Sequence, residues 1–117
     1  MHELALAESI VRIASEHAAG RRVTSVEVLV GHLRQVVPSA LAFSFELVSE
    51  GTPLEGAELV IVDVEAVGRC RRCGAETRLL QFPLACGACA SLDVDVVRGE
   101  ELYVDSLELE EGLAASA

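Results

Sequence analysis

The sequence predicts an α/β (α+β) fold, in which two helices pack on a mainly antiparallel three-stranded sheet and a small cysteine-rich segment is inserted into the chain. Three observations lead to this prediction. Two stretches repeat apolar residues at three- and four-residue intervals, as amphipathic helices do. Stretches around residues 26, 61 and 104 alternate β-branched and polar residues, as strands do. Two regularly spaced pairs of cysteines fall between the last two of these strands.

Both predicted helices lie in the first half of the chain. The first covers residues 3–19, and Gly20 is a suitable end for it. Its expected apolar stripe consists of Leu6, Ile10, Ile13 and His17, widened by Leu4, Val11 and Ala14. The second helix begins at Pro38, a residue that suits the first turn of a helix, and ends before Gly51.

The predicted strands determine the domain organisation. Residues 23–33 and 58–67 alternate as strands, and residues 92–97 and 101–110 are also extended. The cysteines come after the second of these four segments. We therefore expect one discontinuous domain made of residues 1–67 and 92–111, an inserted domain over 68–91, and a disordered tail over 112–117.

The composition excludes several classes of protein. Hydrophobic residues make up 51% of the 117 residues but aromatic residues only 3%, so the core is aliphatic. The net charge is −10, which opposes binding to nucleic acid because phosphate backbones require a positive surface. The chain start lacks a basic region, and no apolar run is long enough to span a membrane. We expect a cytoplasmic protein whose cysteines are not paired as disulfides.

The cysteines have the spacing of a zinc site. They follow the pattern Cys-x2-Cys-x12-Cys-x2-Cys and are Cys70, Cys73, Cys86 and Cys89. Two residues between cysteines let both thiolates of a tight turn reach one ion, and two such turns complete a tetrahedron. Because four thiolates leave no position for an activated water, the zinc is expected to be structural. Iron in a rubredoxin-like electron carrier is the main alternative. Such sites are usually packed by aromatic side chains, and aromatic residues make up only 3% of this chain.

The residues around the cysteines support two further expectations. Four nearby arginines are expected to offset the negative charge of a four-thiolate centre: Arg69, Arg71, Arg72 and Arg78. The first cysteine turn ends on Gly74, which adopts positive φ readily, whereas Ala90 occupies the matching position in the second. Positive φ at an alanine costs about 1 kcal/mol.

The first residues of the chain can chelate a second metal. The amine of Met1, the backbone nitrogen of His2 and its imidazole close one five-membered and one six-membered ring on an ion. Three nitrogens in a plane suit Ni(II) or Cu(II). The first N–H groups of a helix have no carbonyl partner, so a metal can replace an amide proton there, and Glu3 reduces the charge penalty.

These features together resemble the HypA/HybF family of nickel metallochaperones in hydrogenase maturation. The resemblance rests on "MHE" at the start, the cysteine quartet, the segment "PSALAFSFELVSEGTPLEGAELVI" and the closing "GEELYVDSLELE". It covers nearly all of residues 1–111. The family usually has Cys-Pro-x-Cys-Gly where this chain has "CGACA".

The resemblance implies a function and its partners. It implies a nickel-binding domain that holds Ni(II) at Met1, His2 and Glu3, and an inserted zinc-ribbon domain with structural Zn2+. It also implies delivery of nickel to the [NiFe]-hydrogenase large-subunit precursor, or to urease in some members, together with a HypB-type GTPase. The residues alone leave one alternative open, a zinc-ribbon protein–protein adaptor with no transferable metal. No catalytic residues stand out, so we do not expect an enzyme.

Overall fold

The structure is a computed structural model that describes residues 3–110. Within this range the chain divides into two compact units. The helix–sheet unit contains the described residues up to Leu29, Val36–Val62 and those from Tyr103 onward. The ribbon unit contains Val30–Gln35 and Asp63–Leu102. The domain boundaries expected from the sequence stay a prediction, and the expected tail over 112–117 lies outside the described residues.

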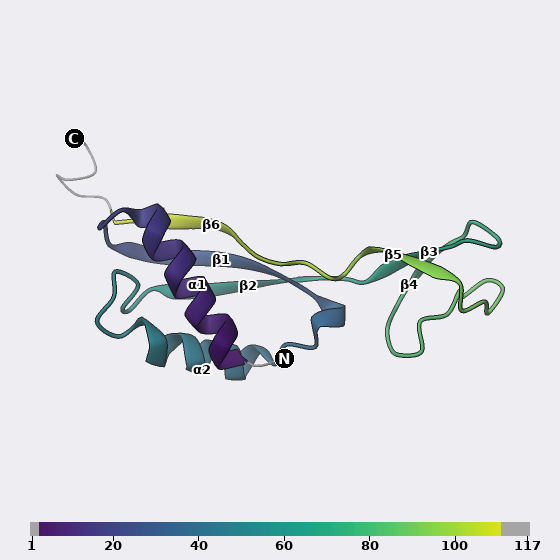
Figure 1. Ribbon diagram of the computed structural model, residues 1–117, viewed down its shortest axis with the longest axis horizontal. Helices are drawn as coiled ribbons and strands as arrows, with labels where there is room; N and C mark the ends of the chain where they lie inside the picture. The colour runs from purple at the N-terminus through teal and green to yellow at the C-terminus, as the bar shows by residue number, and fades with distance from the viewer. Residues whose placement is uncertain (1–2, 111–117) are drawn as a thin grey trace. The chain divides into compact units, whose positions relative to one another are not determined.

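The helix–sheet unit contains both predicted helices (Figure 1). α1 spans Glu3–Ala18 and α2 spans Pro38–Ser49, so both predicted helices are confirmed to within one residue at each end. The start of α1 lies beside the start of α2, where the Val37 N–H donates to Glu3 Oε2 at 3.0 Å. No described helix is long and apolar enough to cross a membrane.

The sheet of this unit has the strand order β2-β1-β6. β1 is Val23–Gly31, β2 is Glu58–Val64 and β6 is Leu102–Leu109, which confirms the three predicted strands. The sheet is mixed: β1 and β2 run in the same direction in Figure 1, while β6 runs back. The parallel pair follows from the crossover through α2, because neighbouring parallel strands need a long connection. The sheet differs from the mainly antiparallel one that the sequence predicts because this crossover makes one of its two strand pairs parallel.

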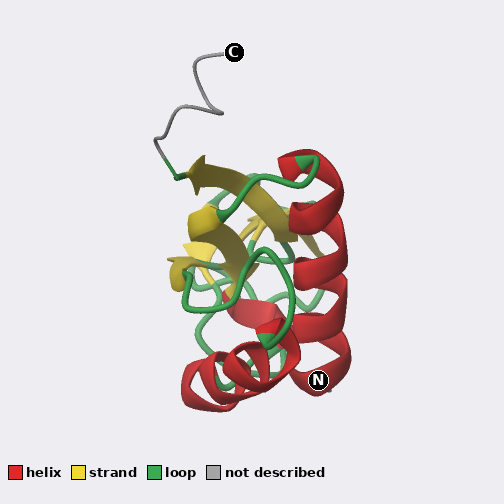
Figure 2. Cartoon of the chain, turned by 90° about the vertical axis from the view of Figure 1, so that its left-hand side faces the viewer, coloured by secondary structure: helices red, strands yellow, loops and turns green. Residues whose placement is uncertain are grey.

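An aliphatic core joins the sheet to the helices. α1 runs along one face of the sheet, and Figure 2 shows it beside the strands. The buried apolar side chains of the unit come from α1, β1, α2 and the turn after α2, and the largest fully buried ones are Leu41, Leu54, Val23, Val26 and Val28. This core matches the aliphatic composition of the sequence.

The ribbon unit is built on a second antiparallel sheet of order β4-β3-β5. β3 is Val67–Cys70, β4 is Glu76–Arg78 and β5 is Val94–Arg98. Val67 pairs with Arg78 on one side and with Arg98 on the other. The unit also contains a short 3-10 helix at His32–Arg34, and its first two residues fall at the end of the range predicted as a strand. The sheet positions the first two cysteines at the end of β3.

Candidate metal centre

Two tight turns present the four cysteines. The first turn follows β3, where the Gly74 N–H donates to the Cys70 carbonyl at 3.0 Å. The second is closed in the same way by the Ala90 N–H and the Cys86 carbonyl at 2.9 Å. Gly74 has φ 78° and Ala90 has φ 64°, so the alanine does adopt the left-handed conformation. The two turns are therefore equivalent in backbone geometry although their sequences differ.

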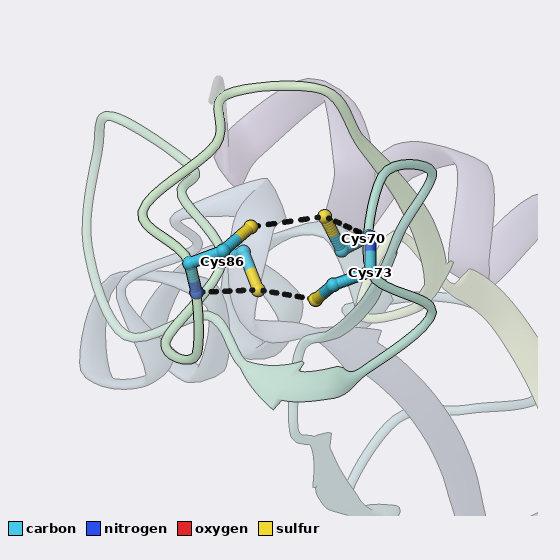
Figure 3. A group of neighbouring side chains, drawn as sticks. Cys70, Cys73 and Cys86 are labelled. Atoms are coloured by element: carbon cyan, nitrogen blue, oxygen red, sulfur yellow. Dashed lines mark hydrogen bonds between the residues drawn. The ribbon is translucent and has the colours of Figure 1, made fainter.

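The four sulfur atoms meet at one place (Figure 3). All four lie within 4.8 Å of one another, and the Sγ atoms of Cys70 and Cys89 and those of Cys73 and Cys86 are 3.6 Å apart. A tetrahedral ion with metal–sulfur bonds of about 2.3 Å places its ligand sulfurs about 3.8 Å apart. The cluster therefore has the size of a four-thiolate metal site, and the four described cysteines form no disulfide.

Backbone N–H groups favour the thiolate form of the first cysteine in each turn. The N–H groups of Arg72 and Cys73 point at Cys70 Sγ, and those of Ala88 and Cys89 point at Cys86 Sγ. The Cys89 and Ala88 N–H groups lower the pKa of the Cys86 thiol to about 6. The pKa of Cys70 is lowered as well, chiefly by the Cys73 N–H. Because metals bind thiolates and not thiols, this arrangement fits a metal centre.

The second turn is supported by a residue that no motif in the sequence marks. The Thr77 Oγ1 of β4 accepts a hydrogen bond from the Gly87 N–H at 3.0 Å. A Cβ at Gly87 would lie 3.1 Å from Thr77 Cγ2, so glycine permits this close approach. The two residues are ten positions apart, and no local pattern marks their contact. Only the short strand β4, which the sequence analysis did not predict, brings them together.

Most of the arginines expected to offset the charge of the four thiolates pair with carboxylates instead. Arg69 pairs with Glu76 at 2.7 Å, and Arg78 pairs with Glu65 at 3.2 Å. Arg71 contacts Asp95 and lies 3.4 Å from Asp93, and it lowers the pKa of Asp95 through its hydrogen bond and charge. These carboxylates neutralise three of the four arginines. Arg72 makes no ion pair with any residue in the described range.

The second predicted metal site lies at the edge of the described chain. Met1 and His2 lie outside the described residues, so their positions are not part of the structure. Glu3 is the first residue of α1, and its carboxylate accepts the Val37 N–H described above. α2 has no side-chain cap from its own Val37, so Glu3 supplies an acceptor that the start of this helix otherwise lacks.

Comparison with known proteins identifies the family. The model of the family HypA, described as hydrogenase/urease nickel incorporation metallochaperone, matches residues 1–109. The chain belongs to the HypA family. This result confirms the resemblance drawn from the sequence. It also confirms that the function is that of a nickel metallochaperone in hydrogenase maturation and not that of an enzyme.

Individual relatives span nearly the whole HypA-family chain. This chain is 47% identical to the hydrogenase maturation factor HypA of Geotalea uraniireducens over 110 residues, which are 94% of this chain and 100% of that protein. The identity to the HypA of Nostoc punctiforme is 40% over 95% of this chain and 97% of that protein. The solution structure of the nickel metallochaperone HypA from Helicobacter pylori matches with a TM-score of 0.66 and 25% identity, covering 93% of this chain and 97% of that one.

Proposed function

We propose that this HypA-family chain binds Ni(II) at its first three residues and delivers it for maturation of [NiFe]-hydrogenase. The observation that carries the proposal is the family match, which begins at residue 1 and so includes "MHE". Urease is the second possible client, because the family description includes it.

The proposed nickel ligands are the Met1 amine, the His2 amide nitrogen and imidazole, and Glu3. The three nitrogens form a planar chelate suited to Ni(II). The contact between Glu3 and the Val37 N–H supports a second role for this residue, in which its side chain orients the first turn of α1 against α2. A cargo site with few ligands at a chain end also suits release of the ion.

We propose that the four-cysteine cluster holds structural zinc through Cys70, Cys73, Cys86 and Cys89. The sulfur separations support a tetrahedral ion, and four protein ligands leave no open position for chemistry. Zinc bound there supplies a compact tetrahedral link between the two turns. The residues themselves supply the thiolates and the N–H groups that stabilise them.

We infer that the partners are those of the resemblance, a HypB-type GTPase and the hydrogenase large-subunit precursor, in the cytoplasm. The net charge of −10 supports the absence of nucleic acid among them. The adaptor hypothesis differs from this proposal in metal content alone. An adaptor binds zinc only, whereas the proposed carrier binds zinc and one nickel ion.

Calorimetric titration with nickel tests the proposal. The zinc-loaded untagged chain is compared with His2→Ala and with a chain that carries a short extension before Met1. The extension turns the amine into an amide and removes a ligand, so both changes are expected to abolish tight nickel binding without altering zinc content. His17→Ala is the matched control, because His17 is exposed on the same helix. Unchanged nickel affinity in the extended chain would refute the N-terminal chelate and favour the adaptor.

The same titration has an expected pH dependence. Each nitrogen must lose a proton before it binds the ion. The imidazole and the amine titrate near ~6.5 and ~7.7–8.0 in model peptides. Nickel affinity is therefore expected to fall steadily as the pH drops from about 8 to about 6. An affinity that stays constant over this range would contradict these ligands.

A further inference from the structure

The four-cysteine cluster has two unequal halves. Cys70 and Cys86 are 2% and 4% exposed, whereas Cys73 and Cys89 are exposed. Two N–H groups converge on each buried sulfur at 3.3–3.5 Å. Within the described residues, neither exposed sulfur receives such a pair. The exposed sulfurs are therefore the two that a small molecule from solvent can reach directly.

A hollow of about 480 Å3 lies beside the exposed sulfurs and is lined by Arg72, Cys73, Cys89, Ala90 and Ser91. Arg72 is the arginine of the first turn that has no carboxylate partner among the described residues. A cation next to an accessible thiolate is the typical surrounding of a reactive cysteine. The hollow therefore offers a small electrophile both a positive charge and two sulfur nucleophiles.

We propose that Cys73 and Cys89 form a modification site for hydrogen peroxide, at which oxidation joins the two sulfurs and opens the metal centre. The inference rests on the zinc content proposed above. The distance permits the reaction, because all four sulfurs lie within 4.8 Å of one another. Oxidants would then release the metal ion and destabilise the ribbon unit.

The oxidation occurs in two steps. The thiolate of one exposed cysteine attacks a peroxide oxygen, so that an S–O bond forms, the O–O bond breaks and hydroxide leaves. The Arg72 guanidinium stabilises this hydroxide. The second thiolate attacks the sulfenic sulfur, an S–S bond forms and another hydroxide leaves. Two thiolates are oxidised, one peroxide is reduced to two hydroxides, and the two buried thiolates that remain are too few ligands for tight binding.

The test treats the zinc-loaded full chain with hydrogen peroxide. Zinc release is followed with a chromogenic chelator, and free thiols are trapped by alkylation before disulfide-linked peptides are mapped by mass spectrometry. Arg72→Ala is compared with Arg69→Ala, which removes the same charge from an arginine that pairs with Glu76 and does not line the hollow. Both variants keep all four cysteines, so the cluster stays intact.

We expect a disulfide between Cys73 and Cys89 as the first product, formed together with zinc release. Arg72→Ala should slow release about threefold, while Arg69→Ala leaves it unchanged. A first disulfide within one turn, or earlier oxidation of Cys70 or Cys86, would overturn the site. Equal rates in the two variants would overturn the role of Arg72. Zinc content measured before peroxide is added separates these outcomes from a failure of the zinc proposal.

Discussion

The helix–sheet unit buries aliphatic side chains from α1, β1 and α2, whereas the ribbon unit buries few. The buried apolar side chains of the ribbon unit are Val30, Ala66, Val67, Leu79 and two of the cysteines. Several large apolar side chains of the same unit remain exposed: Leu80, Phe82, Leu92 and Val97. The comparison shows how one short chain can use two sources of stability. One unit relies on removing apolar surface from water, and the other on ligands that converge on one point.

Removal of zinc should distinguish the two units most strongly. Structural zinc contributes on the order of 10 kcal/mol to a small domain, so chelation should unfold the ribbon and leave α1 and α2 folded. Hydrogen exchange measured by mass spectrometry would show lost protection in β3 and β5 and retained protection in the helices. Addition of zinc should restore the ribbon. Protected ribbon amides in the zinc-free chain would contradict the comparison.

A cavity in the helix–sheet core should destabilise the helix–sheet unit and leave the ribbon unit folded. Leu41 is 0% exposed on α2, and Leu41→Ala is expected to reduce the free energy of unfolding of this unit by about 3 kcal/mol. Leu47→Ala on the same helix is the matched control, because Leu47 is 50% exposed. Urea denaturation followed by circular dichroism measures the effect. Zinc content should stay unchanged in both variants, and loss of zinc from Leu41→Ala would mean that the two units do not have separate sources of stability.

The contact between α1 and α2 should give the smallest effect. Glu3→Ala removes the acceptor at the start of α2 and is expected to cost about 1 kcal/mol, as loss of a helix cap does. Glu3→Gln keeps a carbonyl oxygen that accepts the Val37 N–H, so it should cost less. Glu8→Ala is the control, since Glu8 is exposed on the same helix. If Glu3→Gln weakens nickel binding at unchanged stability, the carboxylate is a ligand in addition to an anchor.

The elements with strong periodicity were predictable from the sequence. Both helices and the three strands of the larger sheet have the expected type and nearly the expected bounds. The cysteine turns were predictable because a Cys-x2-Cys spacing determines its own local geometry. The comparison of the two turns identified Ala90 as the position that matches Gly74, but only the structure shows that it adopts positive φ.

The parts that could not be predicted depend on contacts between distant residues. The predicted strand over 58–67 is divided into β2 and β3, because the chain leaves one sheet at Glu65 and Ala66 and joins another. Gly99 approaches Ala66 so closely that a Cβ there would lie 2.5 Å from the Ala66 Cα. No pattern within residues 58–67 predicts this close approach of Gly99 to Ala66.

The buried face of α1 also differs from the expected stripe. Leu4 is 54% exposed and His17 is exposed, whereas small residues form much of the buried face. The buried residues of the helix are Ala7, Ile10, Val11, Ala14 and Ala18. Periodicity identified the helix. Its apolar residues cover a wide part of the helix surface, so the face that is buried depends on which elements pack against it. Small side chains allow the closest approach, so the alanines turn inward.

The pairing of Val67 with Arg98 has a consequence for the order in which the chain assembles. β2 ends at Val64 and β6 begins at Leu102, so the residues between them form a long loop that must close before β6 reaches the sheet. A ribbon already folded around its ion joins Val67 to Arg98 and shortens the free part of that loop to a few residues. By loop-closure entropy, this lowers the cost of adding β6 by ~1–2 kcal/mol. Metal binding at the cysteine turns is thus expected to make β6, the last strand of the helix–sheet unit, easier to place.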